Sequence, residues 1–588
     1  MTLAHWLHRT AQAHPQSPAA ALGPKTVRRY RELGAAAGAL ATFLRRSGAR
    51  RAKPIAIVSE NRAEVIETLF ACWWCGLTAA PIDPTLGEAD LTAALAYADA
   101  EICFASPRAS GAVMGARAGL KRVIVYDGRE YRAALSCDEA SGPAPTPTKP
   151  AAWLSFSDRE PGQPPRAAVL SHGALMNMAL SLLGEVDPVK PRDAQLHALP
   201  WWGPAGFAML PALARGGVNV MPETGDFDPA ELFENASRWR RASTVVSDHH
   251  LRSMIDCRAK MAQNHFRTLV VSGGGVSPEL IQEGLAKFGP RLARIYGQCA
   301  FPLGLTRLNA HDVSARSEPF WATRIRSVGR PFLLTEIAIR GENSNSALGP
   351  DQVGRIFARG HHGMKGYWRD RRGKSEPGGG AWRFTGMLGS MDAHGYLSVL
   401  GDPEHLLHTR GGDRAPPEQL ESALLDEGAA ADVGATTRRN ANTGEPEIVV
   451  FYQRRKIEET LASEAEAFDD DALQDAAESE DEAADADGIG ADETDRPDAA
   501  CDETARADDA DAEAGPRPGA LAAAWKAMSD AAIPAPEPFA IAARYELGAL
   551  PRSANGRLQR AMLAAMAAER ARREAPRRGG GRGRGAVA

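Results

Sequence analysis

The sequence of 588 residues has no long apolar run. Met1 to Ala20 alternates polar and apolar residues, without the unbroken apolar core of a secretion signal, and no later run approaches the roughly 20 residues that a membrane span needs. Apolar residues make up 44% and charged residues 24% of the chain, which is typical of a folded soluble protein. We therefore expect a cytoplasmic protein without a membrane span, long enough to hold two or more domains.

Cysteine is also scarce, and the pattern of metal-binding side chains is incomplete. Seven cysteines are scattered along the chain, and the one close pair, Cys72 and Cys75, brackets two tryptophans in an apolar stretch without a second ligand pair. The histidine pairs His249-His250 and His361-His362 have no third ligand at metal spacing. We predict no metal site and interpret the histidines as loop or packing residues.

Basic residues are almost absent from one long segment. Residues 458–513 hold 24 acidic side chains against two arginines, a net charge of −22, whereas the whole chain carries −5 and its remainder therefore +17. The segment has few aromatic or β-branched residues and cannot bury enough surface to offset its ordering entropy, so we expect a disordered acidic insert. An alternative is that its charge shields the basic remainder, imitates nucleic acid or contacts a protein partner. The Arg/Gly-rich residues 569–588 are expected to form a disordered tail, and nucleic acid is not expected as a partner.

Between these biased segments, apolar runs bounded by glycine and proline alternate with amphipathic stretches, which indicates an α/β protein. Apolar residues from Val65 to Leu77 recur at three- and four-residue spacing and predict one helix, ended by residues 79–84. Residues 54–58, 268–271 and 336–339 predict buried strands of the same large domain.

Several glycine-containing motifs follow one another at characteristic spacing. They are Val271 to Glu279 (VSGGGVSPE), Ile295 to Gln298 (IYGQ), Gly354 to Trp368, Phe384 to Gly386 (FTG), Asp392 to Leu397 (DAHGYL) and Leu550 to Arg560 (LPRSANGRLQR). A tight turn is the ordinary interpretation of any one of them. In this order they resemble the motifs of the adenylate-forming superfamily, which includes acyl-CoA synthetases, luciferases and peptide-synthetase adenylation domains.

The resemblance implies a large N-terminal AMP-binding domain of β-sheets and helices, residues 1–401, and a small mobile α+β C-terminal lid, residues 402–568, interrupted by the acidic insert. It places Glu404 at the hinge. The family reaction is activation of a carboxylic acid by ATP and Mg²⁺ to an acyl-adenylate, followed by transfer to a thiol such as CoA or a carrier protein. A fatty or aryl acid is the implied substrate class.

The resemblance also assigns residues to the site. The nucleotide-binding positions are Gly162 and Arg166 in a phosphate loop, the glycine-rich turn Gly273, Gly274 and Gly275, then Tyr296, Gly297, Gln298, Cys299, Met387 and Asp402. The acyl pocket is expected to include Trp201, Trp202, Gly203 and His249, and Arg557 takes the position of the family's catalytic lysine.

Many of these positions depart from the family pattern. Three prolines between residues 161 and 165 remove N–H donors from the phosphate loop, and Asp158 and Glu160 bring negative charge to it. Cys299-Ala300 stands where the family has Thr-Glu, so a hydroxyl for the α-phosphate and a carboxylate for Mg²⁺ are replaced.

Four further departures affect the ribose, the α-phosphate and the acid. Met387 replaces a ribose-binding aspartate, and Asp402 replaces an arginine. Gly203 replaces a histidine beside the carboxylate. Arg557 keeps the charge of the lysine but changes its reach and hydrogen-bond geometry.

Two hypotheses follow. The chain is either a working ligase, in which Arg166 and Arg557 replace the two family lysines, or a pseudoenzyme that keeps the fold as an acyl-binding, nucleotide-binding or protein-interaction module.

The first prediction concerns the acidic insert. Limited proteolysis should cut first within residues 458–513, and deletion of these residues should leave the melting temperature nearly unchanged, because the segment adds little to any core. Protection of the segment from protease would contradict this prediction and favour a structural or inhibitory role for its charge.

Overall fold

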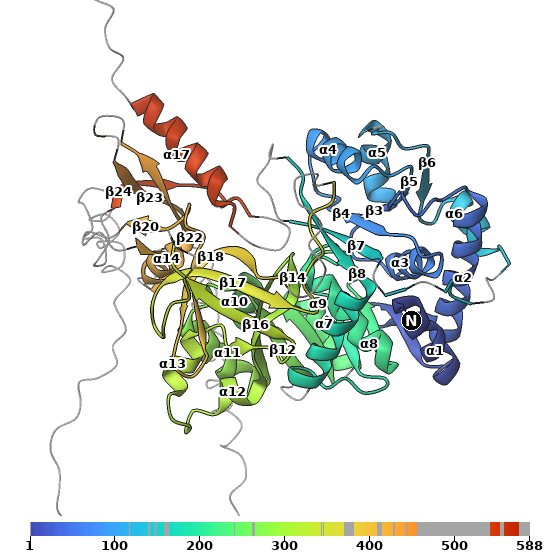
Figure 1. The fold of residues 1–588 in the computed structure, drawn as a ribbon, viewed down its shortest axis with the longest axis horizontal. Helices are drawn as coiled ribbons and strands as arrows, with labels where there is room; N and C mark the ends of the chain where they lie inside the picture. Colours follow the sequence, from blue (N-terminus) through green and yellow to red (C-terminus); the bar gives the residue numbers. More distant parts are fainter. Residues whose placement is uncertain are drawn as a thin grey trace, which may run out of the picture.

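The computed structural model shows a mixed α/β protein whose strands form five sheets within the described residues (Figure 1). It describes residues 2–116, 118–138, 142–145, 147–148, 150–157, 164–239, 241–260, 265–342, 344, 346–369, 381–408, 414–426, 430–440, 443, 445–454, 541–552 and 558–574. The acidic insert 458–513, Gly162 and Arg557 lie outside the described residues.

Two large, mainly parallel sheets form the centre of the molecule. The first has the strand order β15 (Arg330–Pro331), β14 (Phe301–Leu308), β13 (Leu292–Gln298), β12 (Phe266–Ser272), β11 (Ala242–Val246), β9 (Ala194–Leu196), β10 (Val218–Met221), β1 (Pro18–Leu22), β2 (Lys25–Arg29). The second has the order β6 (Arg122–Val125), β5 (Ile102–Ala105), β3 (Ile55–Val58), β4 (Ala79–Ile82), β7 (Ala151–Phe156), β8 (Ala167–Ser171).

Helices cover both faces of each large sheet. Those between the sheets are α1 (Leu3–Ala13), α2 (Tyr30–Arg46), α3 (Glu64–Trp74), α7 (His172–Glu185), η1 (Pro204–Ala208) and α8 (Met209–Arg215). The first sheet's outer face carries α9 (Pro229–Trp239), α10 (Asp248–Asp256) and α11 (Pro278–Phe288), and the second sheet's carries α4 (Glu88–Ala98) and α5 (Pro107–Ala116). Shorter helices are α6 (Arg129–Leu135), α12 (Ala310–Ser314) and α13 (Trp321–Arg326).

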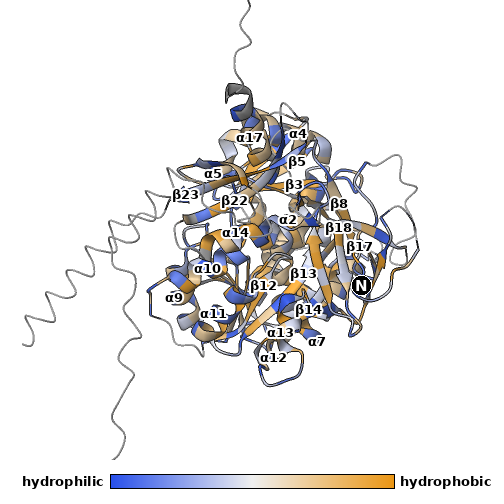
Figure 2. Cartoon of the chain, turned by 90° about the vertical axis from the view of Figure 1, so that its left-hand side faces the viewer, coloured by the Kyte–Doolittle hydropathy of each residue, from blue (hydrophilic) through white to orange (hydrophobic). Residues whose placement is uncertain are grey.

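The alternation of side chains along the strands produces these layers. In β12, Val270 packs into the inner core, whereas Leu269 and Val271 pack with α9 to α11 on the other face. In β3, Ile57 faces the inner core and Val58 faces α4 and α5. Residues 269–271 of β12 and all of β3 are buried on two faces, which explains their continuous apolar sequence; hydrophobic colouring in Figure 2 is accordingly seen along β12.

The remaining strands form smaller sheets that follow the first large sheet along the chain. One has the order β16 (Thr335–Arg340), β17 (Gly354–Gly360), β18 (Arg383–Met391), β19 (Leu397–Gly401). After β20 (Leu407–His408) and β21 (Arg414–Ala415), the strands β22 (Ala430–Arg439), β23 (Pro446–Arg454) and β24 (Ile541–Glu546) pack with α14 (Pro417–Asp426) and α17 (Arg560–Glu574). We call these elements from β20 to α17 the C-terminal unit; the division of domains at residue 401 stays a prediction.

The predicted strands are confirmed as β3, β12 and β16, and the predicted helix as α3. Burial is confirmed for β3 and β12, whereas β16 is buried only at Thr335 and Ile339. The helix ends at Trp74, before Leu77, and β4 follows it where the sequence predicted only a helix terminator. The predicted tail is corrected at its start, because α17 continues to Glu574. No helix in the described part of the chain is long and apolar enough to cross a membrane.

The fold predicts opposite effects for two glycine substitutions. A Cβ at Gly206 would lie 1.8 Å from the Trp201 carbonyl oxygen, so Gly206→Ala should lower the free energy of unfolding by at least about 2 kcal/mol. At Gly184, in α7, a Cβ meets no atom within 4 Å, and Gly184→Ala should raise it by roughly 0.5–1 kcal/mol. Chemical denaturation of the two variants checks this, and a Gly206→Ala protein as stable as the parent would contradict the described packing.

Candidate functional site

The glycine-rich turn Gly273 to Gly275 lies at the carboxyl end of β12, where the parallel strands of the first sheet end. A Cβ at Gly274 would be 3.6 Å from both the Tyr296 ring and the Val399 side chain. A Cβ at Gly275 would be 2.8 Å from Cγ of Glu418, in α14 of the C-terminal unit. The bare backbone of the turn therefore allows the large domain and the C-terminal unit to approach each other closely.

Tyr296 belongs to β13 and packs in an apolar cluster beside this turn. The cluster includes Phe301 and Ile356, and Met387 and Val399 pack against it. Tyr296 is 4% exposed, and its hydroxyl accepts a hydrogen bond from Gln298 Nε2 at 3.3 Å. Its ring consequently has little free face on which a purine could stack.

Cys299 and Ala300 form the two-residue connection between the antiparallel strands β13 and β14. Gln298 pairs with Phe301 across it, and a Cβ at Gly297 would lie 2.8 Å from both Leu303 N and Phe301 O, so the hairpin requires glycine there. The Cys299 thiol contacts the Phe156 carbonyl oxygen at 3.4 Å, at the end of β7. This connection therefore joins the first large sheet to the second beside the phosphate loop.

The described ends of the phosphate loop meet a third motif at the same place. Ser157 N donates to Arg166 O at 3.1 Å, and β8 pairs with residues 365–368 through a bridge between Ala168 and Tyr367. The Arg166 guanidinium lies 3.5 Å from the centroid of the Tyr367 ring. Met364 N donates to Ala300 O at 2.8 Å, so three motifs far apart in the sequence converge on one edge of the two sheets.

Met387 and Asp402, two predicted nucleotide-binding positions, have local structural roles. Met387 lies in β18 directly after Gly386, whose φ is +86°, and its side chain packs against the Tyr296 cluster. The Asp402 carboxylate accepts a hydrogen bond from Glu404 N at 3.0 Å and so shapes the turn after β19. Glu404 is exposed in this turn, and its role as a hinge stays a prediction.

The predicted acyl-pocket residues differ in burial, and their role in a pocket stays a prediction. Trp201 is fully buried, and its backbone N and Nε1 donate to Asn61 Oδ1 and to Ser59 O, at 2.9 and 2.8 Å. Gly203 is also buried, and Trp202 is half-buried. Trp201 is thus a core residue at the carboxyl end of β3, where it fixes the segment that precedes η1.

His249, by contrast, is exposed in the first turn of α10 and faces the C-terminal unit. Desolvation and the nearby charge of Arg552 lower the pKa of His249. The adjacent His250 is buried, which lowers its pKa to about 4, and its Nδ1 lies 2.7 Å from Ser247 Oγ. His250 and His362 are buried packing residues.

Two arginines anchor the segments on either side of residues 553–557. Arg552 binds both carboxylate oxygens of Asp432, at 2.6 and 3.1 Å, and Gln559 N donates to Pro551 O at 2.9 Å. Arg560 binds Glu421 and Glu418 at 2.6 and 2.8 Å. Although burial opposes the charged form, these two carboxylates raise the pKa of Arg560, which therefore stays charged.

Sequence reasoning missed Glu418 and assigned no role to Arg560. Arg560 closes the motif from Leu550 to Arg560, which was the available signal for it. No sequence signal marked Glu418, because its importance comes from contacts to Gly275 and Arg560 that are remote in the chain.

Comparison with known proteins decides the family. A family model described as AMP-binding enzyme matches residues 7–368. The chain belongs to the AMP-binding enzyme family. Feruloyl-CoA synthase from Amycolatopsis sp is 27% identical over 427 residues, covering 72% of this chain and 82% of the relative. Indoleacetate–CoA ligase from Aromatoleum aromaticum is 26% identical over 467 residues, covering 76% and 88%.

Solved structures share the fold of this AMP-binding family member. O-succinylbenzoate coenzyme A synthetase (MenE) from Bacillus subtilis, in complex with AMP, has a TM-score of 0.70 at 20% identity. The similarity covers 95% of this chain and 97% of that one. The large N-terminal domain predicted by the resemblance is confirmed as an adenylate-forming fold.

The contact between the turn and α14 generates a prediction. Gly275→Ala should displace Glu418, whose carboxylate is already held by Arg560 at 2.8 Å, and so weaken docking of the C-terminal unit. Gly274→Ala is the matched control, because its Cβ would make only ordinary contacts at 3.6 Å. Hydrogen exchange should become faster in α14 for Gly275→Ala and stay unchanged for Gly274→Ala; equal exchange in both would contradict the contact.

Proposed function

We propose that this chain joins a carboxylic acid to a thiol through an acyl-adenylate, with an aryl acid as the preferred substrate class and CoA as the acceptor. The observation that carries the proposal is the convergence of the β7–β8 loop, the β13–β14 connection and residues 364–368 at one edge of the sheets. The names of the relatives, which are ligases of feruloyl and indoleacetate substrates, support the aryl class.

The side chains present fit ATP and Mg²⁺ only in part. Ala300 supplies no oxygen ligand for a cation, and within the described residues no cluster of three metal-binding side chains is found. Met387 presents an apolar side chain where the family binds ribose. The phosphate contacts of this chain are therefore assigned to backbone N–H groups and to Arg166 and Arg557.

A second candidate function is a non-catalytic binding module. It is favoured by the burial of Tyr296 in a cluster with Met387 and Val399, because a nucleotide would have to displace apolar packing before its base could stack. In this alternative the protein binds an acid or a protein partner and catalyses no reaction.

Combined reversion distinguishes the two functions. Ala300→Glu, Met387→Asp, Asp402→Arg and Arg557→Lys together should raise acid-dependent pyrophosphate–ATP exchange, whereas each single change should do little. Groups that act on one transition state are strongly non-additive, and one restored donor is typically worth about 10²–10³ in rate. Exchange is measured with short, medium and long fatty acids and with aryl acids.

The matched control is the same quadruple variant with Ala300→Gln in place of Ala300→Glu. Glutamine has nearly the shape of glutamate but no carboxylate, so Mg²⁺ should not raise the exchange rate of the control as it raises that of the quadruple variant. High exchange in the parent chain would show that the natural residues are functional and would exclude the non-catalytic alternative. If the parent exchanges with no acid, the ligase proposal is wrong for the natural chain, and an active quadruple variant would then favour the non-catalytic alternative. A silent quadruple variant would identify the phosphate loop, residues 155–166, as the dominant lesion.

A further inference from the structure

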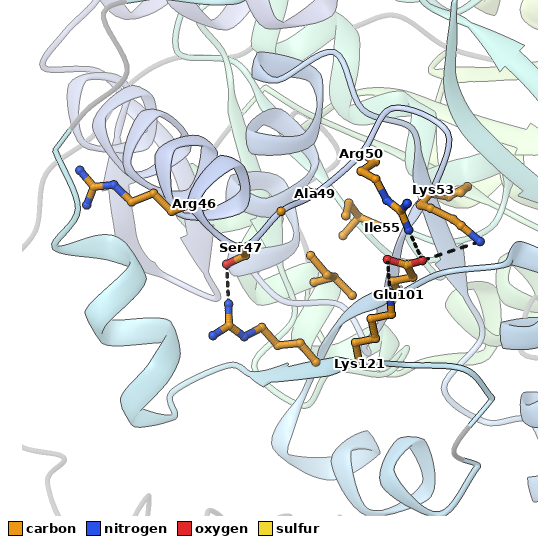
Figure 3. Close-up of a pocket in the computed structure, with 12 residues that line it drawn as sticks. Arg46, Ser47, Ala49, Arg50, Lys53, Ile55, Glu101 and Lys121 are labelled. Carbon is orange, nitrogen blue, oxygen red and sulfur yellow. Dashed lines mark hydrogen bonds and ion pairs between the residues drawn. The ribbon is translucent and has the colours of Figure 1, made fainter.

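A cavity of about 420 Å³ lies at the edge of the second sheet opposite to the candidate functional site (Figure 3). Its walls are the end of α2, the following loop 47–54 and the first residues of β3, β5 and β6. The carboxyl end of the parallel strand β3 leads instead to Ser59 and Asn61, which hold Trp201. The length of the strands therefore separates this cavity from the converged motifs.

The lining of the cavity is strongly basic. Its cations are Arg46, Arg50, Lys53, Lys121 and Arg122, and its carboxylate is Glu101. Outside the lining, Asp99 pairs with Lys53 at 2.7 Å, Glu130 with Arg122 at 2.9 Å and Asp138 with Arg46 at 3.4 Å. The last pair is largely exposed on both sides, and exposed pairs of this kind contribute little. With these partners counted, five cations face four carboxylates, and the wall keeps a net charge of +1.

The contacts of Glu101 show that the cations of the wall can bind an oxyanion. Its carboxylate bridges three cations, with Lys121 at 3.1 Å, Lys53 at 3.9 Å and Arg50 in a shorter contact, as the dashed lines in Figure 3 show. The hydrogen bond from Lys121 is the largest cause that lowers the pKa of Glu101, so this carboxylate is charged at neutral pH. One oxyanion thus already bridges side chains from the loop and from the start of β6.

The geometry points to a binding site for a small molecule that bears a phosphate or diphosphate group. A phosphate offers three oxygens where Glu101 offers two, and arginine and lysine side chains are the common protein partners of phosphate. The volume lies within the roughly 300–1,000 Å³ typical of small-molecule sites. Arg50 and Lys121 are 58% and 69% exposed at their side chains, so they can turn toward a ligand without disturbing the core.

Competition between ligand and Glu101 gives the site a distinctive test. Binding of inorganic pyrophosphate to the full chain is measured by calorimetry without Mg²⁺ at low ionic strength, with inorganic phosphate and AMP as separate arms. Arg50→Gln with Lys121→Gln should weaken pyrophosphate binding about tenfold or more, because two charge-assisted hydrogen bonds are lost. Glu101→Gln should strengthen it several-fold, because the ligand no longer competes with a fixed anion.

Arg108→Gln is the matched control, since Arg108 is exposed, pairs with Asp226 and lies outside the lining. It should leave affinity unchanged. Only the part of each affinity that Arg50→Gln with Lys121→Gln removes belongs to this cavity: if that part is larger for AMP the ligand class is a nucleotide, and if it is larger for pyrophosphate the class is an inorganic diphosphate. Pyrophosphate affinity that Arg50→Gln with Lys121→Gln leaves unchanged, or that Glu101→Gln weakens in a folded variant, would overturn the proposal. Failure here is distinguishable from failure of the ligase proposal, because pyrophosphate–ATP exchange at the other edge does not depend on these residues.

Discussion

The rest of the site depends on the glycine turn 273–275 after β12, because neighbouring side chains pack directly against its bare backbone. Tyr296 and Val399 contact Gly274 from the large domain, and Glu418 contacts Gly275 from the C-terminal unit. No side chain at these positions of the turn separates the two parts of the molecule. Through Glu418 the contact reaches Arg560, which anchors the segment that follows residues 553–557. A backbone constraint in one domain is thereby connected to the predicted catalytic segment of the other.

The departures from the family pattern are integrated into this packing. Met387 packs on the Tyr296 cluster, Ala300 forms a strand connection whose carbonyl holds Met364, and Asp402 closes a turn. Each of these three replacements thus has a local contact of its own, in apolar packing or in turn structure. Restoring one polar side chain would place it among neighbours that have adapted to its absence.

Much of the fold could be predicted from the sequence, because buried strands and an amphipathic helix leave periodic apolar patterns. The order of the glycine motifs was enough to indicate the family, since each glycine marks a turn that a Cβ would disturb, as at Gly297. The strand β4 was missed because its sequence, Ala79 to Ile82, shows no alternation of polar and apolar residues, and Pro81 suggested only the end of the preceding helix. The continuation of α17 to Glu574 was missed because the start of the tail was placed only by its arginine and glycine content, which does not show where a helix ends.

The contacts of the site could not be predicted, because they join residues far apart in the chain. His249 lies near the charge of Arg552, and Trp201 donates to Ser59 O, and neither contact could be read from the sequence. The basic cavity collects cations from residues 46–53 and 121–122, and only the parallel order of β3, β5 and β6 brings them together.

The central claim is that the family fold has been kept while its nucleotide site has been remodelled. Calorimetric titration of ATP with and without Mg²⁺ into the purified chain tests it most directly. Because the Ala300 side chain has no oxygen to ligate a cation and Tyr296 has little free face, the account predicts weak binding that Mg²⁺ does not improve. Micromolar affinity that requires Mg²⁺ would contradict it.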